Sequence, residues 1–139
     1  HESINPLKIH ADTGKNKKSI IYKQMLIPLS DFGETILFEP RWRGEASSFT
    51  INEEEINSNQ GYNKRTNIHI GTENFNKQIY DKYLQHEDYN NLKGLKIKQI
   101  YKWKIGEAFI FDRSFIHCSS TLTKPKIGLT IFFIYKEKP

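Results

Sequence analysis

The sequence predicts a mostly β domain that rolls into a double-stranded β-helix, or jelly roll, with one inserted helix. Segments rich in β-branched and aromatic residues alternate with turn clusters along the chain, and about six or seven of them qualify as strands. One segment alone repeats its apolar residues at helical spacing. A double-sheet jelly roll has about eight strands, so this count favours that architecture.

The first part of the chain contains three candidate strands. A short extended run over residues 7–11 ends at a turn cluster that begins with Asp12. Residues 19–29 are apolar and long enough for a central strand, and residues 34–40 form the next candidate. The short turn between these two segments predicts a hairpin.

Residues 41–71 are polar, rich in Asn and Glu, and without a period. A loop of this length inside a compact domain is usually either a functional lid or poorly ordered. We interpret it as a candidate substrate loop, with a plain surface excursion as the alternative. Arg41, Trp42 and Arg43 begin the loop and are its candidate specificity contacts, while Phe49 is a candidate to pack it down.

The one predicted helix covers residues 72–85, where Thr72 or Asn74 is the expected cap. Its apolar residues recur at helical spacing, namely Phe75, Ile79, Tyr83 and Leu84. Residues 95–105 then alternate between apolar residues and lysines, which predicts a half-buried antiparallel strand with its lysines in water. Two further strands, 107–112 and 126–135, are expected to flank a loop that exposes His117.

The composition is that of one globular domain over residues 1–139. Hydrophobic residues make up 37% of the chain and aromatic residues 13%. No apolar run approaches the roughly 20 residues of a membrane span, and no signal-peptide pattern opens the chain, so we expect no membrane partner. The single cysteine, Cys118, excludes an internal disulfide and suits a reducing compartment, hence a cytoplasmic location. Whether a further segment precedes His1 is left open.

The formal charge of +5 suggests an anionic partner without identifying one. Of the 21 basic residues only four are arginines, and the lysines are scattered along the chain. Arginine is the preferred side chain for phosphate recognition, and dispersed lysines are usually a solvated surface. Nucleic acid is therefore a weakly supported partner.

Three residues from opposite ends of the chain form a candidate metal site: His10, Asp12 and His117. Strand side chains alternate, so a His-x-Asp pair on an extended segment points both side chains to one face. A third ligand from a neighbouring strand would complete a 2-His-1-carboxylate triad, which favours non-haem Fe(II) and leaves coordination positions open. The pattern His-x-Asp alone has little specificity, and a second copy, His86 to Asp88, is interpreted as chance.

The residues around this site resemble the motifs of the 2-oxoglutarate/Fe(II)-dependent oxygenases. The stretch GEAFIFDRSFIHCSS is similar to the family's second metal motif, in which a strand ending in Phe-Asp leads to the distal histidine. KWKIG is similar to the Trp-x-x-Gly turn before that strand, and PLKIHADTG matches the first motif in place and order. The resemblance covers residues 7–135 and is closest to the phytanoyl-hydroxylase-like and prolyl-hydroxylase-like branches.

The resemblance implies a dioxygenase, in particular a hydroxylase, that uses Fe(II), 2-oxoglutarate and O2. It implies that Lys126 pairs with the far carboxylate of 2-oxoglutarate and that Thr130, on the same strand face, adds a hydroxyl. The family more often has Arg at this position, and Lys is weaker in bidentate carboxylate recognition. Lys124 is an alternative anchor, and Lys23 or Tyr22 would serve if the anchor comes from the strand after the first motif.

Two other functions remain open, as does the substrate, whether a small molecule or a macromolecule. One is a cupin-like metal-binding protein, an isomerase or other dioxygenase without 2-oxoglutarate chemistry. The other is a non-catalytic nucleic-acid-binding module. Several residues have structural interpretations: His69 as a packed or surface histidine, Cys118 as a core residue and Arg113 as an ion-pair partner. Tyr22, Gln24 and Ser119 are unranked candidates to orient the metal-binding histidines.

Overall fold

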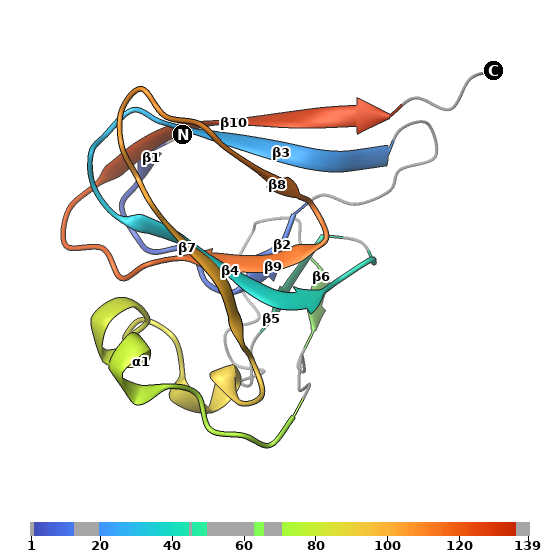
Figure 1. Ribbon diagram of the computed structural model, residues 1–139, viewed down its shortest axis with the longest axis vertical. Coiled ribbons are helices and arrows are strands. Elements are labelled where there is room, and N and C mark those ends of the chain that lie inside the picture. Colours follow the sequence, from blue (N-terminus) through green and yellow to red (C-terminus); the bar gives the residue numbers. More distant parts are fainter. Residues whose placement is uncertain (1, 13–19, 45, 50–62, 66–70, 136–139) are drawn as a thin grey trace.

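A computed structural model describes residues 2–12, 20–44, 46–49, 63–65 and 71–135 (Figure 1). The elements in these ranges are mostly strands. In chain order they are β1 (Glu2–Ser3), β2 (His10–Ala11), β3 (Ile20–Pro28), β4 (Glu34–Arg41), β5 (Ser47–Phe49), β6 (Asn63–Arg65), helix α1 (Lys77–Tyr83), the 3-10 helix η2 (Tyr89–Leu92), β7 (Ile97–Lys102), β8 (Phe109–Asp112), β9 (Phe115–Ser119) and β10 (Lys126–Tyr135).

The strands form two sheets that face each other. One has the order β1-β10-β3-β8 and the other the order β6-β5-β2-β9-β4-β7. Every pairing is antiparallel except that of β5 with β6, which is parallel. The prediction of a mostly β chain with antiparallel sheets is confirmed.

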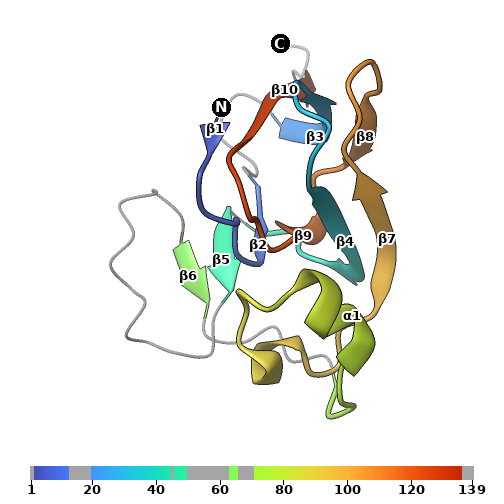
Figure 2. The same cartoon turned by 90° about the vertical axis from the view of Figure 1, so that its left-hand side faces the viewer.

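The six-stranded sheet is the middle of three layers, between the four-stranded sheet and α1 (Figures 1 and 2). Apolar residues cover both of its faces. The cluster between the sheets consists of Leu26, Leu37, Trp103, Phe111 and Phe115. The cluster on the helical side is larger and includes Ile9, Ala11, Ile36, Phe38, Ile116 and Cys118 from the sheet and Phe75, Leu84, Leu92 and Leu95 from the helical segment.

The predicted hairpin between residues 19–29 and 34–40 is wrong. β3 pairs with β10 and β8, whereas β4 pairs with β7 and β9 in the other sheet. The reason lies in the burial of β4, whose four consecutive residues from Thr35 to Phe38 are all buried. A strand with both faces covered belongs in the middle layer, so the turn before it carries the chain from one sheet to the other.

The prediction that His117 lies on an exposed loop is wrong. His117 is the central residue of β9, a strand whose five residues are all buried. The tight turn before it is held by Asp112, whose Oδ1 accepts hydrogen bonds from the backbone N–H and the hydroxyl of Ser114 at 2.9 and 2.7 Å. Because this turn reverses the chain within two residues, the stretch read as a loop contains a whole strand.

The helix is shorter than predicted and has a different cap. α1 begins after Asn76, whose side-chain oxygen accepts a hydrogen bond from the backbone N–H of Ile79 at 3.1 Å. Neither Thr72 nor Asn74 is the cap, since both precede Asn76 in non-helical backbone. In the described part of the chain, no helix combines the length and the apolar character that crossing a bilayer requires.

Part of the predicted long loop is strand. β4 continues to Arg41, and β5 and β6 lie within residues 41–71. Trp42 and Phe49 pack edge to face with ring centroids 5.4 Å apart, as the sequence suggested. The rest of this interval, including His69, lies outside the described residues. The prediction that β7 alternates cleanly is wrong at its centre, where Gln99 is exposed beside Lys98 and the pairing with β4 shifts register. The exposed lysines of β7 lie on the edge of the sheet, where charges discourage pairing with another chain.

Gly128 makes room for Trp103 between the two sheets, and this contact provides a test of the packing. A Cβ atom at residue 128 would lie 2.5 Å from Cη2 of Trp103, which is only 3% exposed. We therefore expect Gly128→Ala to lower the free energy of unfolding by about 1–3 kcal/mol, the usual cost of overpacking a core. The tryptophan emission should change with it, and chemical denaturation followed by fluorescence measures both.

Gly106→Ala is the control for this variant. Gly106 has a positive φ of 86° and no atom near the position of a Cβ, so its substitution strains the backbone without touching Trp103. Its expected cost is about 1 kcal/mol with unchanged native emission. A Gly128→Ala protein as stable as the wild type would contradict this account of the packing.

Candidate metal centre

Strand pairing brings His10 and His117 together. The two residues are Cα partners in the antiparallel pairing of β2 with β9. Directly opposed residues in such a pair have Cβ atoms about 4.5–5.5 Å apart on the same face of the sheet. The two imidazole rings accordingly lie with their centroids 4.3 Å apart and tilted by 52°.

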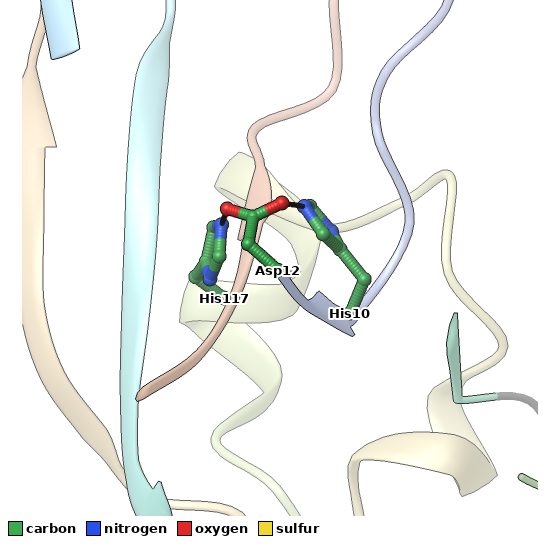
Figure 3. A group of neighbouring side chains, drawn as sticks. All are labelled: His10, Asp12 and His117. Carbon is green, nitrogen blue, oxygen red and sulfur yellow. Dashed lines mark ion pairs between the residues drawn. The ribbon is translucent and has the colours of Figure 1, made fainter. Parts of the chain in front are cut away.

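Asp12 follows β2 and completes the cluster (Figure 3). Its Oδ1 lies 3.5 Å from Nε2 of His10 and its Oδ2 lies 3.0 Å from Nε2 of His117. All three residues are buried, and each offers one ligand atom within 4.8 Å of the others. The sequence prediction that His-x-Asp would point both side chains to one face and meet His117 is confirmed.

Backbone carbonyls fix the tautomer of both histidines. Nδ1 of His10 lies 2.7 Å from the carbonyl oxygen of Lys8, and Nδ1 of His117 lies 3.0 Å from that of Phe115. A carbonyl only accepts, so in each ring Nδ1 carries the proton and donates it. Nε2, the atom of each ring that faces Asp12, is then the nitrogen left for a metal ion: it has a lone pair in the neutral ring and carries a proton toward Asp12 in the imidazolium. Metal-ligating histidines commonly make this kind of second hydrogen bond.

The electrostatics of the cluster favour a charged carboxylate between imidazoles. Burial alone would raise the pKa of Asp12, but His117 and His10 outweigh it and hold this pKa well below its usual value. Burial alone would lower the pKa of His10, but Asp12 chiefly raises it above 6.5. The site therefore attracts positive charge, either a proton on His10 or a metal ion.

These three residues could bind a metal ion. Two neutral imidazole nitrogens and one carboxylate suit divalent transition metals, and the set leaves further coordination positions open. Within the described residues, no other group of three His, Cys, Asp or Glu side chains converges in this way. At the second His-x-Asp pair, His86 bonds to the Thr121 hydroxyl at 3.1 Å and Asp88 caps η2.

A cavity of about 420 Å³ opens from the cluster into the space between the sheets. It is lined mainly by apolar surface, with polar groups at a few points. The lining residues are Leu7, Lys8, His10, Asp12, Gln24, Leu26, Thr35, Ser48, Trp103, His117, Ser119, Lys126, Thr130 and Phe132. A cavity of this size and character accommodates a small ligand.

Lys126 brings a buried cation to this cavity. The residue is 2% exposed, its Nζ donates to the backbone carbonyl of Glu34 at 3.3 Å, and the ammonium lies 4.1 Å from the centroid of the Trp103 ring. Burial lowers its pKa to about 8. No carboxylate in the described part of the chain lies within ion-pair distance of Nζ. A buried ammonium that lacks a carboxylate partner is a candidate to receive an anionic ligand.

The structure brings some of the other predicted site residues to the cavity and leaves others outside it. Thr130 lines the cavity on the same face of β10 as Lys126. Lys23 points to the opposite face of β3 from the buried Gln24 and is exposed, as are Tyr22 and Lys124. None of these three lines the cavity.

The remaining candidates have structural contacts. Cys118 faces the helical core, where burial raises its pKa well above the usual value, so it is not a reactive thiol. Arg113 donates to the Gly44 carbonyl at 3.1 Å. Among the candidates to orient the histidines, Gln24 contacts His117 directly, whereas Ser119 accepts from the backbone N–H of Leu7 at 2.6 Å.

Trp103 and Thr35 are among the cavity residues that sequence reasoning missed. Trp103 was read as part of a turn and a half-buried strand, yet its ring forms the wall beneath Lys126. Its Nε1 donates to the Thr35 hydroxyl at 2.8 Å, and Thr35 itself lines the cavity. No signal in the sequence marked Thr35, because its role depends on the pairing of β4 with β7, two strands far apart in the sequence.

The chain was compared with known protein families, with curated proteins and with solved structures, and no match was found. Function is therefore inferred from the site. The site consists of a buried His-Asp-His cluster and a buried lysine that line the same cavity.

The titration of His10 predicts how metal affinity depends on pH. Because its pKa lies above 6.5, a metal ion must displace a proton from His10 at lower pH. We expect affinity for Co(II) or Mn(II) to fall by roughly tenfold per pH unit below the pKa of His10. Titration of the metal at several pH values, with the melting temperature as readout, measures this.

The metal-free protein is the control, because its stability should change in the opposite sense. A raised folded-state pKa adds stability that is present below pH 6.5 and is lost as the pH rises through the folded pKa. The His10–Asp12 pair should therefore stabilise the metal-free protein more at mildly acidic than at alkaline pH. Metal affinity that does not change across this range would contradict the assignment of His10 as a ligand.

Proposed function

We propose that this protein is a non-haem Fe(II)- and 2-oxoglutarate-dependent dioxygenase, and in particular a hydroxylase. One observation carries the proposal: a buried 2-His-1-carboxylate cluster and the buried Lys126 line the same cavity. 2-Oxoglutarate is a dicarboxylate that binds the metal at one end and needs a cation at the other. A metal site and a lysine in one cavity supply both.

We also propose that the two facing sheets are a double-stranded β-helix of the jelly-roll, cupin-like kind. The cavity lies between the two sheets, and the cluster comes from the six-stranded one. Side chains from both inner faces line the cavity. Such an arrangement suits a fold in which a rolled sheet encloses a ligand site.

The three ligands would hold Fe(II) on one side of the ion. His10 and His117 would bind through Nε2, because Nδ1–H of each ring is held by a backbone carbonyl. Asp12 would bind through a carboxylate oxygen and offset part of the ion's charge. A triad on one face leaves the other positions free for co-substrate and oxygen, and they would open toward the cavity.

Lys126 would bind the far carboxylate of 2-oxoglutarate, with Thr130 adding a hydroxyl. The ammonium is already partly desolvated, so an anion loses less by joining it than it would at a hydrated surface lysine. Thr35 accepts from Trp103 through its oxygen, which leaves its own O–H available to donate into the cavity. These three residues line the cavity together.

When bound, Fe(II) with 2-oxoglutarate and O2 supplies oxidative chemistry that converts the co-substrate to succinate and CO2 and hydroxylates a C–H bond. The chain's own residues would bind the ion and the co-substrate, orient them and exclude water. Leu26, Trp103 and Phe132 form apolar cavity walls, which keep water from the reacting atoms. The backbone carbonyls hold the Nδ1 protons of both histidines, so neither ring can rotate without losing a hydrogen bond.

A second candidate function is a cupin-like metal protein that does not use 2-oxoglutarate. It is favoured by the presence of a lysine, and not an arginine, at position 126. The lysine ammonium is a point charge, whereas the guanidinium of arginine binds a carboxylate through two parallel N–H groups. The Nζ of Lys126 also already has the Glu34 carbonyl as an acceptor. Metal binding without any 2-oxoglutarate binding would select this alternative.

The proposal predicts that 2-oxoglutarate binding depends on metal. A ligand that binds only the native state raises its stability, by about 2.7 kcal/mol at 100 times Kd. We expect Mn(II) alone to raise the melting temperature, 2-oxoglutarate alone to have little effect, and the two together to raise it further. With Fe(II) and O2, the protein should form succinate from 2-oxoglutarate, even without a substrate.

Asp12→Ala is the control for both measurements, because it removes the only carboxylate of the triad. It should abolish the metal shift and succinate formation together. A wild-type protein that binds Mn(II) yet neither binds nor turns over 2-oxoglutarate would contradict the proposed activity.

Lys126→Met should separate co-substrate binding from metal binding. Loss of a charged hydrogen bond is expected to weaken 2-oxoglutarate binding by roughly tenfold to a hundredfold, with Mn(II) affinity unchanged. Lys124→Met is the matched control, since Lys124 is exposed and lies against Phe32 at 4.7 Å from its centroid. Isothermal titration of both ligands into both variants makes the comparison. An equal loss of 2-oxoglutarate affinity in the two variants would contradict the assignment of Lys126.

The same substitution has an expected effect on stability. A lysine whose folded pKa is lowered from 10.5 to about 8 opposes folding while it is charged. The wild-type protein should therefore gain stability relative to Lys126→Met as the pH rises from about 8 toward 10.5. Near neutral pH the variant should be at least as stable as the wild type.

A further inference from the structure

Gln24 is a buried amide at the wall of the cavity. It lies on β3, in one cross-strand row with Phe132 of β10 and Phe111 of β8. Its side chain is 0% exposed and lines the cavity beside His117. Burying an amide among phenylalanines is costly unless its polar atoms find partners. The partners of Gln24 therefore indicate what the residue does.

One end of the amide is bonded to a metal ligand. Nε2 of Gln24 lies 3.3 Å from Nε2 of His117. Nε2 of His117 also lies 3.0 Å from Oδ2 of Asp12, so without a metal ion this ring nitrogen contacts both the carboxylate and the amide. Gln24 therefore contacts the ring nitrogen with which His117 would bind a metal.

The other end of the amide has no partner. Oε1 of Gln24 is fully buried and accepts no hydrogen bond in the described part of the chain. Most buried polar atoms in proteins have a partner, so an unsatisfied acceptor beside a candidate metal site points to a donor that arrives with the ligand. Water bound to a divalent cation is a strong donor of this kind.

The amide of Gln24 and a metal ion compete for the same nitrogen of His117. When an ion binds Nε2 of His117, the amide of Gln24 loses this contact and must reorient. We propose that Gln24 is a positioning residue of the metal centre that caps His117 while the site is empty. On loading it turns so that Oε1 accepts a hydrogen bond from water on the ion. This inference rests on metal binding by the triad and not on 2-oxoglutarate chemistry.

Nuclear magnetic resonance on the wild-type protein tests the reorientation directly. We expect Zn(II), a diamagnetic probe, to shift the side-chain amide resonances of Gln24 more than those of the exposed Gln99 on β7. The same addition to His10→Ala, which lacks one ligand, should leave the Gln24 resonances in place. Gln24 resonances that do not move when Zn(II) binds the wild-type protein would overturn the proposal.

Gln24→Leu tests the consequence for metal entry and for bound water. Without the cap, Co(II) should associate faster by about threefold to tenfold, the factor that corresponds to one neutral hydrogen bond. Without Oε1, water on bound Mn(II) should exchange faster, as measured by proton relaxation. Gln99→Leu, on an exposed edge strand, is the matched control and should change neither rate. Unchanged rates in folded Gln24→Leu would also overturn the proposal.

Failure of this proposal and failure of the proposed oxygenase function give different results. A protein that binds Zn(II) and moves Gln24, yet never binds 2-oxoglutarate, would support the role of Gln24 and reject the oxygenase. A protein that turns over 2-oxoglutarate while the Gln24 resonances stay fixed would support the oxygenase and reject the role of Gln24. If Gln24→Leu does not fold, the wild-type spectra alone decide the role of Gln24.

Discussion

The pairing of β2 with β9 is the constraint on which the whole site depends. A register slip by one residue would turn His10 away from His117 and into the helical core. β2 has only two paired residues, so its register needs support from outside the ladder. The residue before His10 provides it: Ile9 is fully buried in the helical core, its N–H donates to the buried carboxylate of Glu87 at 2.6 Å, and its carbonyl accepts from Phe49 at 2.9 Å. Packing on one face of β2 thus fixes the position of His10 on the other face.

The cavity contains two buried polar groups that lower the stability of the ligand-free fold. Lys126 is buried, and its ammonium has a ring and a carbonyl as neighbours instead of a carboxylate. The buried oxygen of Gln24 has no hydrogen-bond donor among the described residues. Each group costs free energy in the ligand-free fold and each faces the same cavity. Local departures from a satisfied core are expected where a ligand supplies the missing partners.

Sequence reasoning succeeded where the structure depends on local patterns and failed where it depends on contacts between distant segments. The convergence of His10, Asp12 and His117 was predictable because residue chemistry and alternation along a strand restrict the choices. The hairpin of β3 with β4 was wrong because sheet membership depends on which faces are covered, which a local pattern does not contain. The helix cap at Asn76 was missed because several cap residues precede the helix. The contacts of Gln24 required strand pairing between distant segments, and no local signal encodes this. The jelly-roll and oxygenase assignments remain predictions.

The central claim is that His10, Asp12 and His117 bind one metal ion between them. A crystal of the protein soaked with Mn(II), with diffraction data collected for anomalous scattering, tests it most directly. The account predicts one strong peak bonded to Nε2 of both histidines and to a carboxylate oxygen of Asp12, with the direct contacts between these side chains replaced by contacts to the ion. A difference map without a peak there, with the three side chains still paired to one another at high Mn(II) concentration, would contradict it.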